Sequence, residues 1–236
     1  MPKIPELVEL LKSGVHFGHH VSKRDPKMTP YIYTDRNQIH IIDLEMTVEK
    51  LKEALDFLTK VAATGGVVLF VASKNQARAL IEKYAKECNM PYVNYRWLGG
   101  TFTNLSNILK LIKKLKTLEQ KKVSGELEKY TKKEQLEFQK VIVKLNELVG
   151  GIKGMEKLPA AIYVVDIKKE KTAVTEASKK GVPIVAMVDT NVNPEKVDYP
   201  IPANDDAAKS IELITALVAE AIKEGRSKFE TNQKDK

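Results

Sequence analysis

Continuous apolar runs alternate with helical patterns over much of the chain. The runs Val67–Ala72, Ala160–Val165 and Ile184–Val188 lack charged residues, which is typical of strands buried on both faces of a sheet. Apolar residues have helical spacing in three stretches: residues 75–88, the stretch that follows Val165 and ends at Lys180, and residues from about 206 to 225. Strands that alternate with helices in this way imply parallel pairing through right-handed crossovers. The pattern predicts an α/β three-layer sandwich with a mainly parallel sheet.

A different pattern precedes the first buried strand. Tyr31–Tyr33 and Gln38–Ile42 are short β-rich runs on either side of Asp35–Asn37, which predicts a hairpin at a sheet edge. A helix from about 47 to 64 is expected to connect this hairpin to the first central strand.

Residues 104–153 interrupt the alternation of strands and helices. Two narrow apolar seams recur here at steps of three, four and three residues, a spacing typical of antiparallel coiled-coil helices. They consist of Leu105, Ile108, Ile112 and Leu115, and of Phe138, Val141, Leu145 and Leu148. Thr131 and Glu134 have capping-box spacing at the start of the second helix, and Gly150-Gly151 is expected to end it. We expect a helical hairpin that protrudes as an arm.

The same patterns predict the domain organisation. A discontinuous globular domain comprises residues 1–103 and 154–225, and the arm comprises residues 104–153. The polar residues 226–236 are expected to form a flexible tail. A content of 43% hydrophobic residues suffices for a sizeable core, although aromatic residues reach only 6%.

Charge is distributed unevenly along the chain. The formal net charge is +8, and the segment from Leu105 to Lys153 carries 12 basic and 6 acidic residues, a net of +6. The remainder of the chain is nearly neutral by comparison. A basic excess confined to one segment points to a polyanionic partner at the arm.

Several features indicate a cytoplasmic protein. Cys88 is the single cysteine, so one chain can form neither an internal disulfide nor a thiolate metal cluster. The first residues lack the features of a signal peptide. No apolar run approaches the roughly 20 residues that cross a bilayer. We therefore expect no membrane partner.

The signatures of phosphate-binding enzymes are absent from the sequence. Neither G-x-G-x-x-G after a strand nor G-x-x-x-x-G-K-[ST] occurs, and no G-x-S-x-G elbow is found. The fold class alone does not imply an enzyme. The alternative, a small-molecule or phosphate-binding enzyme or regulator, would depend on aspartates at the ends of strands, such as Asp166 and Asp189.

Two groups of residues could bind a metal ion. Asp189 and Asp205 follow predicted strands and could hold a structural divalent cation, although aspartate in such places also caps helices or forms turns. His16 and His19 have the spacing of paired metal ligands, but histidines that hydrogen-bond in a glycine-containing turn account for them more simply. No other cofactor is expected.

Basic and flat side chains cluster at two further places. The first cluster lies near Tyr31 and Tyr33 in the sequence and consists of Lys23, Arg24, Lys27 and Arg36. In the second, Arg96-Trp97 lies beside Gly99-Gly100 and Phe102. Such mixtures suit contacts with RNA phosphates and stacking on bases. Trp97 and Phe102 could equally be core residues that attach the arm to the sheet. The uncompensated lysines of the arm favour the RNA interpretation.

Six motifs occur in series along the chain: Gly14-Val-His-Phe-Gly-His19, Asp25-Pro-Lys-Met28, Arg36-Asn-Gln-Ile-His-Ile-Ile-Asp-Leu44, Arg96-Trp-Leu-Gly-Gly-Thr-Phe-Thr-Asn104, Val188-Asp-Thr-Asn191 with Pro194, and Ile201-Pro-Ala-Asn-Asp-Asp-Ala207. Together they resemble the family of ribosomal protein S2, in its bacterial form with the helical insertion. The resemblance extends from about Ile4 to Lys223. Two departures are His20, where glutamine is usual, and Arg24, where an aromatic residue is usual.

The resemblance implies a flavodoxin-like sheet with a coiled-coil arm and no enzymatic activity. It implies a structural protein at the head–body junction of the small ribosomal subunit, which binds small-subunit ribosomal RNA and not DNA. Neighbouring small-subunit proteins, among them ribosomal protein S1, are the implied protein partners. The residues expected to contact RNA are Lys23, Arg24, Lys27, Arg36, Asn37, Arg96, Trp97, Thr103, Asn104, Lys110, Lys113 and Lys114.

Overall fold

The main sheet is parallel and lies at the centre of the molecule. The computed structural model describes residues 4–234, and within them this sheet has five strands in the order β5-β4-β6-β7-β8. The strands are β4 (Val68–Val71), β5 (Tyr92–Val93), β6 (Ala161–Val165), β7 (Ile184–Val188) and β8 (Tyr199–Pro202). Every pairing among them is parallel. Numbered along the chain, this order is the 2-1-3-4-5 arrangement of flavodoxin-like sheets.

Helices cover both faces of the main sheet, as the apolar runs predict. Val68 and Phe70 of β4 pack with α2 (Leu44–Ala63), α3 (Asn75–Glu87) and α7 (Ala208–Lys234). Leu69 and Val71 face the opposite side, where α6 (Lys171–Lys180) and the root of the arm lie. Successive strand residues therefore enter different cores, and the strands carry no polar alternation because both faces are buried. The prediction of an α/β core with a mainly parallel sheet is confirmed.

A second, smaller sheet lies beside this body. Its strands are β1 (Phe17–His20), β2 (Ile32–Arg36) and β3 (Ile39–Ile42), in the antiparallel order β1-β3-β2. Asn37 and Gln38 form the turn between β2 and β3 with φ of 50° and 62°, which suits a two-residue hairpin. The predicted hairpin is present, but it belongs to a separate sheet. The expectation of a sheet edge is met within this small sheet, where β2 is an edge strand.

Short helices complete the regions around this sheet. They are α1 (Leu7–Lys12) and the 3-10 helices η1 (Val21–Lys23), η2 (Pro26–Tyr31) and η5 (Pro194–Lys196). The Asp25 side chain caps η2 by accepting a hydrogen bond from the Lys27 backbone at 2.9 Å. The turns that carry the first basic cluster are therefore held in fixed conformations.

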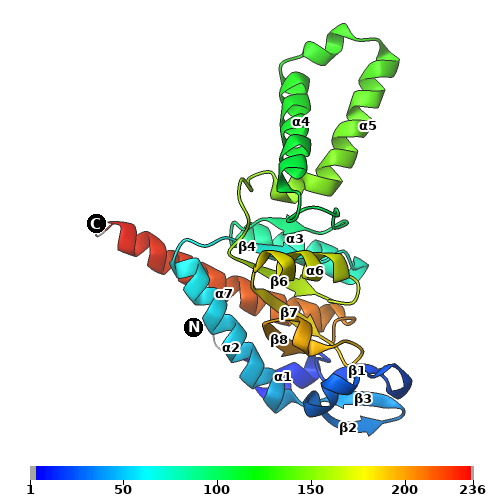
Figure 1. Cartoon of the computed structure of the whole chain (residues 1–236), viewed down its shortest axis with the longest axis vertical. Coiled ribbons are helices and arrows are strands. Elements are labelled where there is room, and N and C mark those ends of the chain that lie inside the picture. Colours follow the sequence, from blue (N-terminus) through cyan, green and yellow to red (C-terminus); the bar gives the residue numbers. More distant parts are fainter. Residues whose placement is uncertain (1–3, 235–236) are drawn as a thin grey trace.

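Two helices inserted between β5 and β6 stand away from the sheet (Figure 1). They are α4 (Leu105–Val123) and α5 (Lys132–Val149), joined by η3 (Glu126–Lys129) and followed by η4 (Gly150–Ile152). Thr131 and Glu134 form the predicted capping box at the start of α5. Gly151 approaches β5 so closely that an added Cβ would lie 2.2 Å from the Tyr92 carbonyl oxygen. This close approach fixes the root of the arm.

The apolar seam of α5 differs from the predicted one. Ile142, Leu145 and Val149 are buried, whereas Val141 is 37% exposed. The prediction placed Val141 and Leu148 in the seam because it repeated the spacing of α4. Burial of Val149 is favoured at the root, where the helix meets the body and the last turn must face the sheet.

The C-terminal helix is longer than predicted. Helix α7 continues to Lys234, so the expected end near Gly225 and the flexible tail from residue 226 are wrong for the residues described. Arg226 donates hydrogen bonds to the carbonyl oxygens of Cys88 and Asn89 at 3.4 and 3.0 Å. Phe229 lies against Gly65. These contacts with the body stabilise the additional turns. Residues 235 and 236 lie outside the described residues.

Candidate nucleic-acid interface

The first basic cluster lies on the turns around the small sheet. Lys23, Arg24 and Lys27 are exposed on η1 and η2 and between them. Lys27 Nζ lies 2.7 Å from Glu195 Oε1, an exposed ion pair that holds η2 against η5. Lys23 and Arg24 extend the same exposed edge. The positive charge of Lys27 is thus partly compensated, while its two neighbours present theirs to the solvent.

The second group is the turn between β2 and β3. Arg36 and Asn37 are exposed at the tip of this hairpin, and Tyr33 on β2 is 75% exposed. Exposed aromatic, guanidinium and amide side chains on one hairpin are suited to stacking and phosphate contacts. The turn and the first basic cluster lie on the same small-sheet region of the molecule.

The third group is the loop 96–104 at the root of the arm, and its conformation depends on Glu176. This α6 carboxylate is only 6% exposed and accepts hydrogen bonds from the backbone N–H groups of Gly100, Phe102 and Thr103 at 2.7, 2.9 and 3.1 Å. The Trp97 indole N–H and the Thr103 hydroxyl donate to it at 3.3 and 3.2 Å. These donors outweigh the effect of burial and lower the pKa of Glu176.

The loop therefore presents only some of its predicted contact residues. Trp97 is 7% exposed and packs edge-on against Phe102 with ring centroids 5.0 Å apart. Arg96 and Asn104 are exposed on either side of this buried pair. Thr103 is exposed, but its backbone and hydroxyl donors are engaged with Glu176. Arg96 and Asn104 remain the side chains of the loop with the freest access to an external partner.

The fourth group is the lysine face of α4. Lys110, Lys113 and Lys114 are exposed and line a hollow of about 390 Å³ together with Lys121. Helix α4 contains six lysines and one glutamate, a net of +5, whereas α5 contains four lysines and three glutamates, a net of +1. The basic excess that the sequence locates in the arm is thus concentrated on one of its two helices.

These groups form two separate regions. Figure 1 shows the arm at one end of the long axis and the small sheet at the other. The structure therefore brings Arg96, Asn104 and the α4 lysines into one region and Lys23 to Asn37 into another. A single compact RNA site is not formed, and a partner that touches both regions must be extended.

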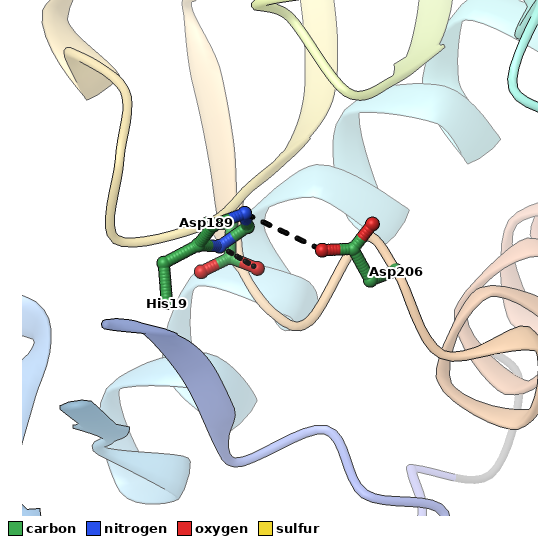
Figure 2. A group of neighbouring side chains, drawn as sticks. All are labelled: His19, Asp189 and Asp206. Carbon is green, nitrogen blue, oxygen red and sulfur yellow. Dashed lines mark ion pairs between the residues drawn. The ribbon is translucent and has the colours of Figure 1, made fainter. Parts of the chain in front are cut away.

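A histidine and two aspartates converge at the carboxyl ends of the main strands (Figure 2). His19 Nδ1 lies 3.1 Å from Asp189 Oδ2, and its Nε2 lies 3.3 Å from Asp206 Oδ2. The hydrogen bond with Asp189 and the nearby negative charges raise the pKa of His19, against the opposing effect of burial. One potential ligand atom from each side chain lies within 4.8 Å of the others. These three groups could hold a divalent cation.

Asp205, the other predicted ligand, has a different partner. Its carboxylate is buried and lies 2.7 Å from Lys74 Nζ, which also lies 3.2 Å from Asp166 and 2.6 Å from Asp206. Burial raises the pKa of Asp205 to about 7, and the negative charges of Asp166 and Asp189 act in the same direction. An ammonium group therefore occupies the position that a cation would need beside Asp205.

The remaining histidines of the first motif have local roles. His20 Nδ1 lies 2.9 Å from the Ser22 hydroxyl, and its Nε2 lies 2.9 Å from the Gln38 side chain. His16 packs against Phe17 with ring centroids 4.0 Å apart. The paired ligands suggested by the spacing of His16 and His19 are therefore not brought together, and only His19 joins the acidic cluster.

Comparison with known proteins decides the family. The profile described as Ribosomal protein S2 matches residues 10–225, most of the chain. The chain belongs to the ribosomal protein S2 family. It is 49% identical over 228 residues to small ribosomal subunit protein uS2 of Fusobacterium nucleatum, covering 96% of this chain and 92% of that protein. It is also similar to the uS2 proteins of Chloroflexus aggregans, at 46% over 233 residues (99% and 98% covered), and Flavobacterium johnsoniae, at 50% over 222 residues (94% and 87%).

Membership of the S2 family confirms several expectations. The family consists of structural, non-enzymatic proteins of the small ribosomal subunit, which is cytoplasmic, so the predicted non-enzymatic, ribosome-associated class is confirmed. The enzyme considered from the strand-end aspartates is thereby excluded. Among residues 4–234, no helix has the length and apolarity that crossing a membrane requires.

Two residues that organise the site of this S2 protein, Glu176 and Lys74, were not among the predicted site residues. Glu176 lies between the buried residues Val174 and Ala177 of α6, so a glutamate on an apolar helix face was an available signal. Lys74 lies two residues after the predicted strand Val67–Ala72 and gave no signal of its own. Its role depends on three aspartates that are far away in the sequence.

Proposed function

We propose that the chain binds small-subunit ribosomal RNA through two basic surfaces and acts as a structural component at the head–body junction. The observation that carries the proposal is the concentration of exposed lysines on α4, with a net charge of +5 against +1 on α5. Lysines on one face of a rigid helix can follow a phosphate backbone. The position at the head–body junction is supported only by the resemblance of the six motifs.

Each of the predicted contact residues has a role in this proposal. Exposed basic and amide side chains, Lys23, Arg24, Lys27, Arg36, Asn37, Arg96, Asn104, Lys110, Lys113 and Lys114, contact RNA directly. Trp97 and Thr103 act by fixing the loop conformation through Glu176, since their hydrogen-bond donors are used inside the protein. The domain division into residues 1–103 with 154–225 and the arm 104–153, with α4 and α5 as a short coiled coil, belongs to the same proposal.

Charge reversal on α4 tests the proposal. The triple variant Lys110→Glu, Lys113→Glu and Lys114→Glu should bind a small-subunit ribosomal RNA transcript at least tenfold more weakly, measured by filter binding. Its dependence of log affinity on log salt should be shallower by about two to three units, because each lost phosphate contact removes roughly one. The matched control reverses Lys171, Lys179 and Lys180, which are exposed on α6. An equal loss in the control would refute the assignment of the α4 face.

Position in the particle needs a second experiment. A tagged copy of the wild-type chain should sediment with small subunits in a sucrose gradient, and Lys23→Glu with Arg24→Glu should shift it toward free protein. We further propose that the bound chain supports recruitment of ribosomal protein S1. Small subunits depleted of this chain should then retain less of protein S1 than complete ones, and equal retention would contradict that part.

We also infer that His19, Asp189 and Asp206 hold a structural divalent cation. Imidazole nitrogen and carboxylate oxygens are common ligands of Zn²⁺, and the three groups come from separate segments that a cation would join. Zn²⁺ should raise the melting temperature of the wild-type protein purified with a chelator and then dialysed. His19→Ala should abolish the increase, and His20→Ala is the control. An increase of equal size in both variants would contradict the inference.

A further inference from the structure

The outer face of α5 carries apolar side chains that are open to the solvent. Leu136 and Val143 are each 53% exposed, and they lie seven residues apart, about two helical turns on the same stripe. The opposite stripe, with Ile142 and Leu145, is buried in the core that lies on the α6 side of the main sheet. Helix α5 therefore has two apolar stripes, and only one of them is covered within the described residues.

The exposed stripe forms one wall of a groove. The cavity between α5 and the segment 95–98 has a volume of about 780 Å³. Leu98 and Leu148 line it and are half-buried, and Tyr95 lines it with 42% of its surface exposed. The length from Leu136 to Leu148 is about 18 Å at about 1.5 Å per residue, which matches about three turns of a helix.

The charges around the groove are predominantly positive. Arg96, Lys140 and Lys144 line it and are exposed, against a single carboxylate from Glu147. An apolar floor with a basic rim is complementary to a segment with an apolar stripe and acidic flanks. Charge complementarity therefore identifies the chemistry of the occupant.

We propose that this groove binds an acidic amphipathic helix of a protein partner. The partner's apolar stripe covers Leu136 and Val143, and its carboxylates pair with Lys140 and Lys144, as in other helix-in-groove complexes. The inference goes beyond the proposed RNA contacts, which on the arm use α4 and share with the groove the residue Arg96. RNA fits the groove poorly, because aliphatic side chains give no stacking surface and Tyr95 is the one aromatic side chain that lines it.

Peptide binding to the full chain tests the proposal. The probe is a fluorescein-labelled 18-residue helical peptide with leucines at helical spacing and flanking glutamates, followed by anisotropy. Val143→Asp should weaken its binding about tenfold, since a charge enters the apolar contact. Val123→Asp is the matched control, because Val123 is 90% exposed at the tip of the arm and outside the groove. Its affinity should remain within twofold of the wild type.

Three further measurements make the outcomes decisive. A peptide with lysines in place of the glutamates should bind at least tenfold more weakly; equal binding would overturn the assigned chemistry, as would the absence of saturable binding by the acidic peptide. Circular dichroism and melting establish that both variants are folded. Val143→Asp should leave affinity for the ribosomal RNA transcript within twofold, whereas the α4 triple variant lowers it. A loss as large as that of the α4 variant would show that RNA occupies the groove.

The groove can also be examined in the assembled particle. Benzoylphenylalanine placed at position 143 of a tagged copy in small subunits should form, on illumination, an adduct that survives ribonuclease. Mass spectrometry should identify the cross-linked segment as an acidic amphipathic one. An adduct with RNA alone, or with a basic segment, overturns the proposal. Failure of the α4 experiment would refute the RNA surface and leave this result intact, so the two can be distinguished.

Discussion

The carboxylate of Glu176 accepts a hydrogen bond from the Phe102 backbone N–H at 2.9 Å and thereby joins α6 to the root of the arm. Several backbone N–H groups that converge on one point form an anion-binding nest. In this protein a side chain of the body occupies the nest, and an RNA phosphate is not needed to order the loop. The direction in which Arg96 and Asn104 leave the loop is consequently fixed before any partner binds.

Replacing Glu176 by glutamine should destabilise the protein by about 2–4 kcal/mol. The amide retains one acceptor oxygen and turns an NH₂ group toward N–H donors, so buried donors lose their partners. Urea unfolding followed by circular dichroism measures the change. Glu137→Gln, an exposed position on α5, should change stability by less than about 0.5 kcal/mol. A loss of the same size in both variants would contradict the role assigned to Glu176.

The effect of Glu176→Gln should depend on pH. The folded protein lowers the pKa of Glu176 below its ordinary value of 4.5, mainly through backbone N–H donors that outweigh burial. The carboxylate therefore contributes its full stability above pH 4.5 and loses it as the pH falls through the lower folded value. The difference between wild type and variant should narrow as the pH falls below 4.5. A difference independent of pH would indicate that shape, and not charge, is responsible.

Lys74→Met should cost about 3–5 kcal/mol at pH 8, because it removes the ammonium group that neutralises three carboxylates in a largely buried site. Burial opposes the charge of Lys74, but Asp205 and Asp206 outweigh it and raise the pKa of the lysine. Urea unfolding at several pH values gives the result. Lys223→Met, which removes an exposed pair with Glu87, should cost less than about 1 kcal/mol.

The cost of Lys74→Met should be smaller at pH 5 than at pH 8. Asp205 has a folded pKa raised from 3.8 to about 7, so protonating it stabilises the folded state. That stabilisation is complete below pH 3.8 and is lost as the pH rises through about 7. At pH 5 the protonated Asp205 requires no counter-charge, so the loss of the ammonium group lowers the free energy of unfolding by less. A cost that increases toward acidic pH would refute this explanation.

Gly225→Ala should destabilise the protein by about 1–3 kcal/mol, although alanine in a helix is ordinarily better than glycine by about 1 kcal/mol. An added Cβ would lie 2.4 Å from the Thr59 carbonyl oxygen and 2.7 Å from Ala62 Cβ, where α7 crosses α2. Differential scanning calorimetry measures the effect. Gly99→Ala, with nothing within 4 Å of the added atom, should stay within about 0.5 kcal/mol. A stabilised Gly225→Ala variant would show that the two helices can move apart.

Gly225 also illustrates why parts of the fold were not predictable. The sequence predicts the end of the helix near this glycine, since glycine often terminates helices. Its actual role is to let two helices approach, and that approach depends on Thr59, far away in the chain. Local patterns sufficed for the buried strands of the main sheet and for the capping box at Thr131. They failed where a distant contact decides, as for Val149 at the root of the arm.

The candidate site shows the same division. Runs of basic residues identified exposed positions such as Arg24, Arg36 and Lys113, since long charged side chains rarely lie inside a protein. The pairing of Asp205 with Lys74, and of His19 with Asp189, joins segments more than 100 residues apart. Such pairs arise from the order of strands in the sheet. Residue spacing along the sequence therefore does not predict these pairs.

The position of α7 has a consequence for synthesis of the protein. Helix α2, made early, packs against α7, which comes from residues 208–234. A nascent chain thus exposes the apolar faces of α2 and α3 until its final helix has been synthesised. In a prematurely terminated product these faces remain exposed to solvent. Such products are substrates for chaperones and proteases. Quality control can thereby remove incomplete copies before they compete with finished ones for a place in a new particle.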